Sequence, residues 1–293
     1  ELGAGTGKLA VDLLTELASL DRLPGRYLIL EPSGDLRERQ QVLLRRRLPG
    51  LFERVQWLDG LPVGFRGVVL ANEVVDAMPV HRFVVGEDGS TAEVFVRPNG
   101  EDWEEVLTDP VSPGLAEAVG RLQDCGLAGD PGYASEVNLR LGPWVVALAA
   151  ALDRGLVLLI DYGYPRAEYY HPERCGGTLM CHHRHRGHGN PYVNIGLQDI
   201  TAHVDFSALA DAAVGAGLEV AGFTTQAHFL IGCGLDGLLA EILAEGSSSD
   251  AMLGAKQLVM PTGMGERFRV LGLGKGVGHP WCGFALRDLR GRL

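Results

Sequence analysis

The sequence predicts an α/β fold of the Rossmann-like type, in which a mainly parallel sheet carries helices on both faces. Helix-like and strand-like segments alternate along the first part of the chain, as they do in such folds. Acidic or amide side chains follow several of the strands, at the edge where parallel sheets bind ligands. The length of 293 residues and the hydrophobic fraction of 46% suffice for one large domain or two moderate ones.

The first elements follow from hydrophobic spacing and turn residues. Leucines recur at helical spacing in the segment after the first glycines, and short apolar runs read as buried strands. Pro-Gly pairs end two of these elements. The expected helices span residues 9–20 and 36–48, and the expected strands span residues 27–30, 55–58 and 67–71.

The middle of the chain departs from this alternation. A hairpin is expected with strands at residues 81–85 and 92–97, followed by helices at residues 110–122 and 134–152. We therefore expect residues 80–141 to form an inserted hairpin and helical subdomain, and residues 1–79 and 142–293 to form the core.

The core is expected to resume after the insertion. A long segment follows, rich in Gly, His, Arg and Tyr, and a loop of such length is either functional or disordered. Its five tyrosines favour a substrate loop. The expected order is a strand at 155–160, the loop at 162–200, a helix at 206–216, a strand at 218–225, two helices, and a terminal strand or hairpin at 268–273 and 281–286.

The overall charge and the cysteines narrow the function. A formal net charge of −11 argues against non-specific nucleic-acid binding, which needs a basic surface. The sequence contains no run of 18 or more apolar residues, so it does not indicate a membrane-spanning helix. Five cysteines without a C-x-x-C pair predict a reduced, cytoplasmic protein. The oligomeric state is left open.

The chain begins with the glycine-rich stretch ELGAGTGK. A P-loop would need Gly at Leu2 and a hydroxyl at Leu9, and the dinucleotide fingerprint would need its third Gly at Lys8. The alternating E-x-G-x-G-x-G pattern resembles instead the first motif of class I S-adenosylmethionine (SAM) methyltransferases. Its glycines let a ligand approach the backbone, and the N-terminus of the next helix favours a carboxylate.

Two acidic residues follow the expected strands at residues 27–30 and 55–58. Glu31 lies 24 positions after Gly7, a spacing typical of a carboxylate that binds ribose hydroxyls, and it would repel a 2′-phosphate. Asp59 would lie near the adenine. The alternatives are a solvated glutamate at a strand end and a simple turn aspartate before Gly60.

The stretch 72–79, NEVVDAMP, is the most informative. Asn72, Glu73 and Asp76 follow a buried strand, and the valines between them suggest partial burial. Buried carboxylates need partners. The partner is either a cationic substrate or a structural arginine.

Five blocks in order resemble the MidA-like family. They are ELGAGTG (1–7), LANEVVDAMPVHRF (70–83), LLIDYGYPRAEYYHPERCGGTL (158–179), DITAHVDFSAL (199–209) and GMGERFRVL (263–271). The family includes mitochondrial methyltransferases that assist assembly of respiratory complex I. The resemblance implies a class I methyltransferase fold with an inserted helical region, SAM as the cofactor, and a protein arginine as the methyl acceptor. Eukaryotic relatives would lie in the mitochondrial matrix, whereas the bacterial-type composition of this chain predicts a cytoplasmic protein.

The resemblance assigns roles to the cofactor residues. Gly3, Gly5 and Gly7 would line the methionyl end of SAM and Glu31 its ribose. Asn72 would contact the cofactor where the methyl group is transferred. Family members carry a substantial segment before the glycine motif, so we expect this chain to be truncated, with one wall of the pocket open.

The acceptor side is expected to be acidic. A pair of carboxylates can grip a guanidinium and aim one nitrogen at the methyl group, and Glu73 and Asp76 are the candidates. Asp161 follows a core strand beside the same cleft. Glu136, expected in the first turn of a helix, is either a further clamp or a dipole-favoured glutamate.

The remaining site candidates are Tyr162 and His203. Tyr162 opens the expected substrate loop, and His203 is either a contact of that loop or structural. Asp205 reads as a helix N-cap. The loop also contains His and Cys residues whose spacing matches no zinc module, so no metal is expected; they are His171, Cys175, Cys181, His182, His183, His185 and His188.

A SAM-dependent methyltransferase acting on a partner protein is therefore the leading hypothesis. An NAD-dependent oxidoreductase is an alternative that Lys8 disfavours. A non-catalytic assembly factor that retains a SAM site is another.

Overall fold

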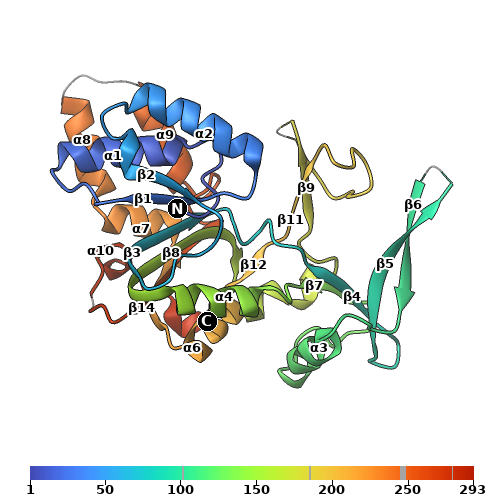
Figure 1. Ribbon diagram of the computed structural model, residues 1–293. Coiled ribbons are helices and arrows are strands. Elements are labelled where there is room, and N and C mark those ends of the chain that lie inside the picture. The colour runs from blue at the N-terminus through green and yellow to red at the C-terminus, as the bar shows by residue number, and fades with distance from the viewer. Residues whose placement is uncertain (101, 185, 245–248, 279) are drawn as a thin grey trace. The chain divides into compact units, whose positions relative to one another are not determined.

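The computed structural model describes residues 1–100, 102–184, 186–244, 249–278 and 280–293. The chain folds into two compact units (Figure 1). The first comprises residues 1–74, 146–160 and 213–290, and the second comprises residues 75–145, 161–212 and 291–293. Strand β8 (Leu152–Tyr164) and helices α4 (Leu141–Ala151) and α6 (Phe206–Gly215) each contribute residues to both units.

The first unit is an α/β structure built around a β-sheet, as predicted. Its strands are β1 (Tyr27–Leu30), β2 (Val55–Leu58), β3 (Phe65–Asn72), β13 (Glu219–Thr225), β14 (Phe268–Lys275) and the first part of β8. Strand β1 pairs with β2 and β3 pairs with β8, both in parallel, whereas β13 and β14 are antiparallel. Leu2 joins β1 to β3 at the centre of the sheet, because it forms parallel bridges with Leu30 and with Ala71.

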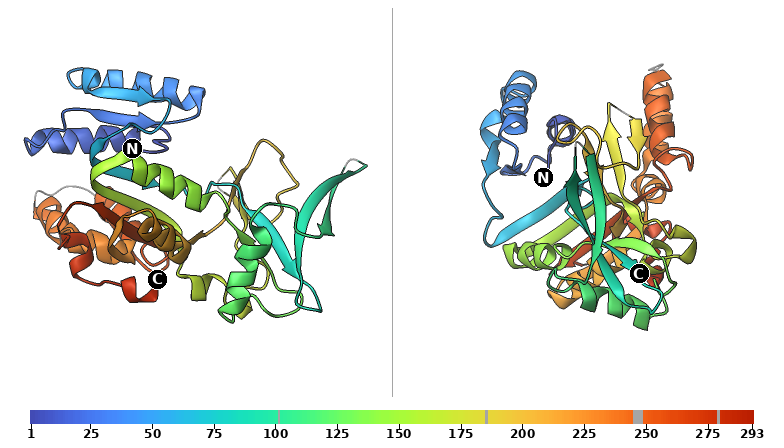
Figure 2. Two further views of the ribbon diagram at one scale, coloured as in Figure 1. Left: turned by 60° about the horizontal axis from the view of Figure 1, so that its bottom comes forward. Right: turned by 90° about the vertical axis from the view of Figure 1, so that its right-hand side faces the viewer.

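Helices α1 (Lys8–Ser19) and α2 (Gly34–Arg47) lie next to β1 and β2 (Figures 1 and 2). Their apolar faces meet these strands in one core, in which Leu14, Ile29 and Leu44 have no exposed surface. Burial of each such side chain contributes about 1.5–3 kcal/mol. The Ser33 hydroxyl caps α2 by accepting a hydrogen bond from Leu36 N. Both helices were predicted and are confirmed.

Short helices complete the first unit. They are α7 (Gln226–Gly232), α8 (Leu235–Ala244), α9 (Ser249–Val259), α10 (Cys282–Ala285), and the 3₁₀ turns η1 (Phe52–Arg54) and η3 (Arg290–Arg292), the last of which ends in the second unit. Three helices thus stand where two were expected. No single described helix is long and apolar enough to cross a membrane, although α7 and α8, bent by 66°, pass this test as a pair.

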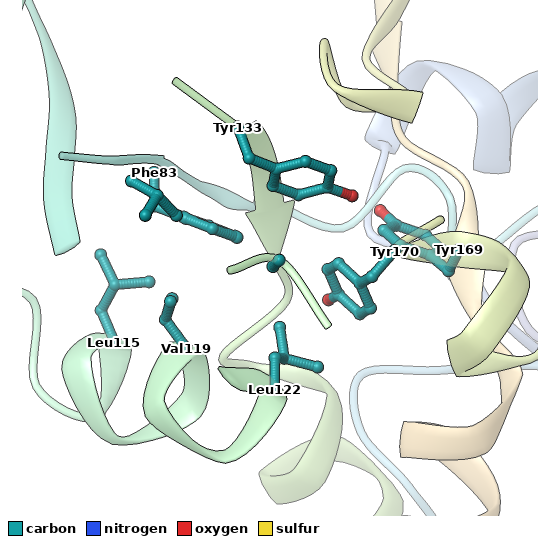
Figure 3. Packing of buried hydrophobic residues seen from close by; sticks show 9 residues of the cluster. Phe83, Leu115, Val119, Leu122, Tyr133, Tyr169 and Tyr170 are labelled. Carbon is teal, nitrogen blue, oxygen red and sulfur yellow. The ribbon is translucent and has the colours of Figure 1, made fainter. Parts of the chain in front are cut away.

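The second unit contains a four-stranded antiparallel sheet in the order β6-β5-β4-β7. Its strands are β4 (His81–Val85), β5 (Thr91–Asn99), β6 (Asp102–Thr108) and β7 (Ala134–Val137). The predicted hairpin is confirmed as β4 and β5. Helix α3 (Leu115–Asp124) packs its apolar face against this sheet and against Tyr169 and Tyr170 (Figure 3).

Three further expectations about secondary structure were wrong. Residues 134–137 form strand β7 instead of the start of a helix, because they pair with β4, and α4 begins only at Leu141. The expected loop at 162–200 holds α5 (Arg166–Tyr169), η2 (Pro172–Arg174), and a small sheet of β9 (Met180–His183), β10 (Arg186–His188) and β11 (Asp199–Thr201). Residues 282–285 form helix α10 instead of a strand, which buries Phe284 against Gly222.

The second unit also contains the end of β8. There β12 (Val204–Asp205) pairs in parallel with Gly163 and Tyr164. A Cβ atom at Gly163 would lie 2.2 Å from the carbonyl oxygen of Val204, so only glycine allows this close pairing. Asp205 Oδ1 accepts a hydrogen bond from Ala208 N at 3.0 Å, which confirms the predicted N-cap of α6.

Candidate active site

The glycine-rich segment turns directly from Leu2, at the centre of the first unit's sheet, into α1. Gly3, Gly5 and Gly7 have φ angles of 62°, 52° and 80°. This left-handed region costs another residue roughly 1–2 kcal/mol. The backbone path between strand and helix therefore requires glycine at all three positions.

Gly5 differs from the other two glycines in its surroundings. A Cβ at Gly3 would lie 3.1 Å from Val74 Cγ2, and one at Gly7 would lie 3.1 Å from Gln40 Cγ. A Cβ at Gly5 would meet no atom within 4 Å. Gly3 and Gly7 allow tight packing, whereas the space at Gly5 leaves its backbone accessible to a ligand.

A buried amide joins the glycine segment to Glu31. Gln40 has no exposed surface, and its Nε2 donates to Gly5 O at 2.8 Å and to Glu31 Oε2 at 3.2 Å. Its Oε1 accepts from the indole N–H of Trp57 at 2.9 Å. Glu31, 5% exposed, also accepts from Ser33 N through Oε1. Gln40 thus holds both predicted cofactor elements in place, and sequence reasoning missed it.

Asp59 lies at the end of β2 with a side chain that is 91% exposed. Its Oδ1 forms an ion pair with Arg37 Nη1 at 2.8 Å. Arg37 also donates to the carbonyl oxygen of Leu58. This arrangement orients the Asp59 carboxylate, and its contact with adenine stays a prediction.

Asn72 and Glu73 follow at the end of β3. Asn72 Nδ2 donates to Glu73 Oε1 at 3.2 Å, and both side chains are exposed. Glu73 has a φ of 52°, rare for a residue with a Cβ, while its N–H continues the ladder by donating to Ile160 O at 2.9 Å. A strained backbone held by its neighbours is a feature that clusters at functional sites.

In the second unit, Asp161 organises the segment that carries Asp76. Its Oδ2 accepts from the N–H groups of Val75 and Asp76 at 3.0 and 3.2 Å, and its Oδ1 accepts from Tyr162 N at 3.0 Å. Burial, and then the charge of Asp76, raise the pKa of Asp161 well above its usual value. Both oxygens are used on the backbone, so this geometry makes Asp161 a positioning residue.

Asp76 itself is buried, with 4% exposure. Its Oδ2 accepts a hydrogen bond from the Tyr162 hydroxyl, and its backbone oxygen accepts from Ala202 N at 3.0 Å. Burial and the bond to Asp76 raise the pKa of Tyr162, so the phenol stays protonated as the donor. The structure thus brings together three predicted residues, Asp76, Asp161 and Tyr162.

Glu136 lies on β7 and is only 1% exposed. Its Oε1 accepts from the Tyr169 hydroxyl at 2.7 Å, from Thr178 N at 2.8 Å and from the Thr178 hydroxyl. The reading of Glu136 as a first-turn helix residue was wrong, because the residue is part of a strand. Thr178 and Tyr169, which hold it, were not predicted.

His203 lies between two tyrosine rings. Its ring centroid is 5.3 Å from that of Tyr162 and 5.2 Å from that of Tyr164, both edge-on. The backbone N–H of His203 donates to the Thr178 hydroxyl at 2.9 Å. Burial, and then the nearby Arg174 charge, lower the pKa of His203 to about 4. The imidazole is therefore neutral at pH 7.

No group of three or more His, Cys, Asp or Glu side chains within the described ranges could hold a metal ion. His185, one of the histidines weighed as a ligand, lies outside the described residues.

Comparisons with known proteins agree with the cofactor geometry. The family model "Putative S-adenosyl-L-methionine-dependent methyltransferase" matches residues 1–224. A crystal structure of a Burkholderia thailandensis protein bound to S-adenosyl-homocysteine is 42% identical and superposes with a TM-score of 0.93, covering 100% of this chain and 75% of that one. The predicted class I methyltransferase fold and the predicted cofactor, SAM, are thereby confirmed, and the alternative cofactor NAD is not.

Two curated relatives are more distant. Protein arginine methyltransferase NDUFAF7 of Danio rerio, mitochondrial, is 28% identical over 92% of this chain. Its Drosophila melanogaster homologue, also mitochondrial, is 30% identical over 75% of this chain. The chain spans 67% and 49% of the lengths of these two proteins.

Proposed function

This chain belongs to the SAM-dependent methyltransferase family whose model it matches, and we propose that it methylates an arginine side chain of a partner protein. The bound S-adenosyl-homocysteine in a relative that is 42% identical over the whole chain is the observation that carries the methyltransferase assignment. The arginine acceptor is supported by the Danio rerio and Drosophila melanogaster relatives, which are named as protein arginine methyltransferases.

The residues of the first unit fit SAM. The open space at Gly5 would admit the methionyl end, next to the N-terminus of α1, which favours a carboxylate. Glu31, oriented by Gln40 and Ser33, would accept hydrogen bonds from the ribose hydroxyls. Asp59 would contact the adenine, and Asn72 would contact the cofactor near the methyl group that is transferred. The negative charge of Glu31 near the ribose also suits a cofactor without a 2′-phosphate.

Bound SAM supplies a methyl group already activated on a sulfonium, so the protein's task is to position the acceptor. The S–CH₃ bond breaks as an N–CH₃ bond forms, and the attacking nitrogen then loses one proton. The carboxylates of Glu73 and Asp76 would grip the guanidinium and stabilise the positive charge that stays on it. Asp161 would keep Asp76 in place through the backbone bonds it accepts.

The first experiment is isothermal calorimetry of the protein with SAM and S-adenosyl-homocysteine. Micromolar binding is expected, and absence of binding to either ligand would contradict the proposal. The second is mass spectrometry of the source proteome with and without the gene. A protein methylarginine that disappears with the gene identifies the acceptor, whereas loss of methyl-lysine alone would refute arginine.

Variants separate catalysis from assembly. Glu73→Gln and Asp76→Asn should abolish the methylarginine while SAM binding survives, and the exposed Glu16→Gln on α1 is the charge-matched control. If the variants lose methylation but the partner still assembles normally, the protein is an assembly factor that retains a SAM site.

A further inference from the structure

The second unit contains a cavity of about 540 Å³. Helices α3 and α5, the segment from β7 to the start of α4, and the segment 202–211 form its walls. Apolar side chains such as Val80, Leu122 and Leu139 cover much of it. Its volume lies in the range of sites that bind small ligands or a long side chain. Val75 and Ala202, which flank and bond the Asp76 segment, also line it.

One carboxylate oxygen in this wall lacks a donor. Glu136 lines the cavity and is 1% exposed. Its Oε1 takes all three hydrogen bonds from Tyr169 and Thr178, and no described residue donates to its Oε2. Rotation of the carboxylate would break those three bonds, so Oε2 is held where it is. A carboxylate oxygen held in this state can still accept a hydrogen bond from a ligand.

The cavity also has an excess of negative groups. Four carboxyl groups and two guanidinium groups line it: Asp124, Glu136, Asp205, Asp211, Arg121 and Arg166. Arg166 forms an ion pair with Asp211 at 2.6 Å and a longer one with Asp205 at 3.7 Å. His203, neutral at pH 7, adds no positive charge.

Asp205 is a largely buried carboxyl group in this set. Its side chain is 11% exposed, and Arg166 is its cationic neighbour. Burial raises the pKa of Asp205 to about 6 despite the opposing effects of the Ala208 N–H and of Arg166. A cation that entered the cavity would therefore be stabilised by charges already in place, whereas an anion would be repelled.

We propose that this cavity binds a second arginine side chain of the acceptor protein, distinct from the one that Glu73 and Asp76 would grip, with Glu136 as its carboxylate anchor. A guanidinium offers planar N–H donors to a fixed carboxylate oxygen, and its methylene stem matches the apolar walls. This inference rests on the proposed function and adds to it a docking site for the acceptor protein.

Cys125 provides a probe that needs no substitution. It is exposed at the end of α3 and lines the cavity, whereas Cys175, exposed in the same unit, does not. The rate of alkylation of each thiol is measured by peptide mass spectrometry in the presence of acetyl-Gly-Arg-Gly-amide. The measurement is repeated with the same peptide in which citrulline or lysine replaces the arginine. At ten times its dissociation constant the arginine peptide should slow alkylation of Cys125 about tenfold. Cys175 should be unaffected, and citrulline, which has the same shape without the charge, should not protect.

Glu136→Gln removes the charge and keeps the shape, and Glu117→Gln, on the exposed side of α3, is the matched control. The first variant should weaken protection by the arginine peptide roughly tenfold or more, and the second should behave as wild type. Both should bind S-adenosyl-homocysteine normally in calorimetry. If Glu136→Gln unfolds by circular dichroism, the three-peptide comparison on the wild-type protein decides alone.

Equal protection of Cys125 by arginine and citrulline would overturn the inference, as would unchanged arginine binding by folded Glu136→Gln. Equal protection by lysine would overturn the guanidinium assignment. If S-adenosyl-homocysteine binds and arginine does not protect, the cavity inference fails and the methyltransferase assignment stands. If S-adenosyl-homocysteine does not bind, the proposed function fails instead.

Discussion

Replacing Gln40 with Glu tests the polar network behind the predicted cofactor residues. The substitution keeps the side-chain shape and the acceptor for the Trp57 indole N–H. It replaces the amide donor with a carboxylate oxygen. That oxygen would face Gly5 O at 2.8 Å and Glu31 Oε2 at 3.2 Å, where two hydrogen bonds now lie.

The distance sets the magnitude of the effect. Two unit charges 3.2 Å apart repel by about 5 kcal/mol at an effective dielectric constant near 20. Uptake of a proton by the introduced carboxyl relieves part of this repulsion, so we expect a loss of about 3–5 kcal/mol in the free energy of unfolding at pH 7.

The loss depends on pH. The repulsion raises the pKa of the introduced carboxyl in the folded state above its unfolded value of about 4.3. Its destabilising effect is therefore small below that pH and grows as the pH rises through the folded value. Affinity for S-adenosyl-homocysteine should also fall at pH 7, because Gln40 orients both Gly5 and Glu31.

The assay is urea denaturation at a series of pH values between 4 and 7. Gln56→Glu, an exposed position on β2, makes the same charge change as a control and should cost little. A loss below about 1 kcal/mol for Gln40→Glu at pH 7 would refute the reasoning, and so would a loss that does not change with pH.

Three further predictions concern single positions. Gly5→Ala should lower the free energy of unfolding by roughly 1–2 kcal/mol, from its left-handed backbone alone, yet weaken S-adenosyl-homocysteine binding in calorimetry; unchanged affinity would show that the open space is not the cofactor site. Gly155→Ala should destabilise the first unit severely, because its Cβ would lie 1.9 Å from Gly67 O between β8 and β3, and a variant that melts like wild type would exclude this close pairing. His203→Phe should flatten the pH dependence of stability. The lowered pKa of His203, about 4, means that wild-type stability is full above its unfolded pKa near 6.5 and falls as the pH drops toward 4, by at most about 3 kcal/mol; identical pH profiles of the two proteins would contradict this.

The glycine turn and most elements of the first unit were predictable because they depend on neighbours in the chain. Alternating Gly3, Gly5 and Gly7 encode a turn of left-handed residues, and the apolar spacing after Lys8 encodes α1. The family resemblance led to SAM, which the comparisons confirm.

Gln40 and Glu136 show where such local reasoning stops. Gln40 lies in a helix full of arginines, and its burial depends on Trp57 and Gly5, which are distant in sequence. One signal was available: Gln40 and the buried Leu44 are four residues apart and so share a helix face. Glu136 lies in residues 134–137, whose hydrophobic pattern is too short to predict a strand. These residues form β7 because they pair with the edge of β4.

The sequence by itself determined the α/β core, the glycine turn and the chemical types at the strand ends, because hydrophobic period and backbone conformation are local properties. Only the tertiary structure decided what each carboxylate can do. Asp161 has both oxygens on backbone amides, Asp76 accepts from Tyr162 through one oxygen, and Glu136 has one oxygen to which no described residue donates. Burial and hydrogen-bond partners decide these roles, and both come from segments that meet only when the chain folds.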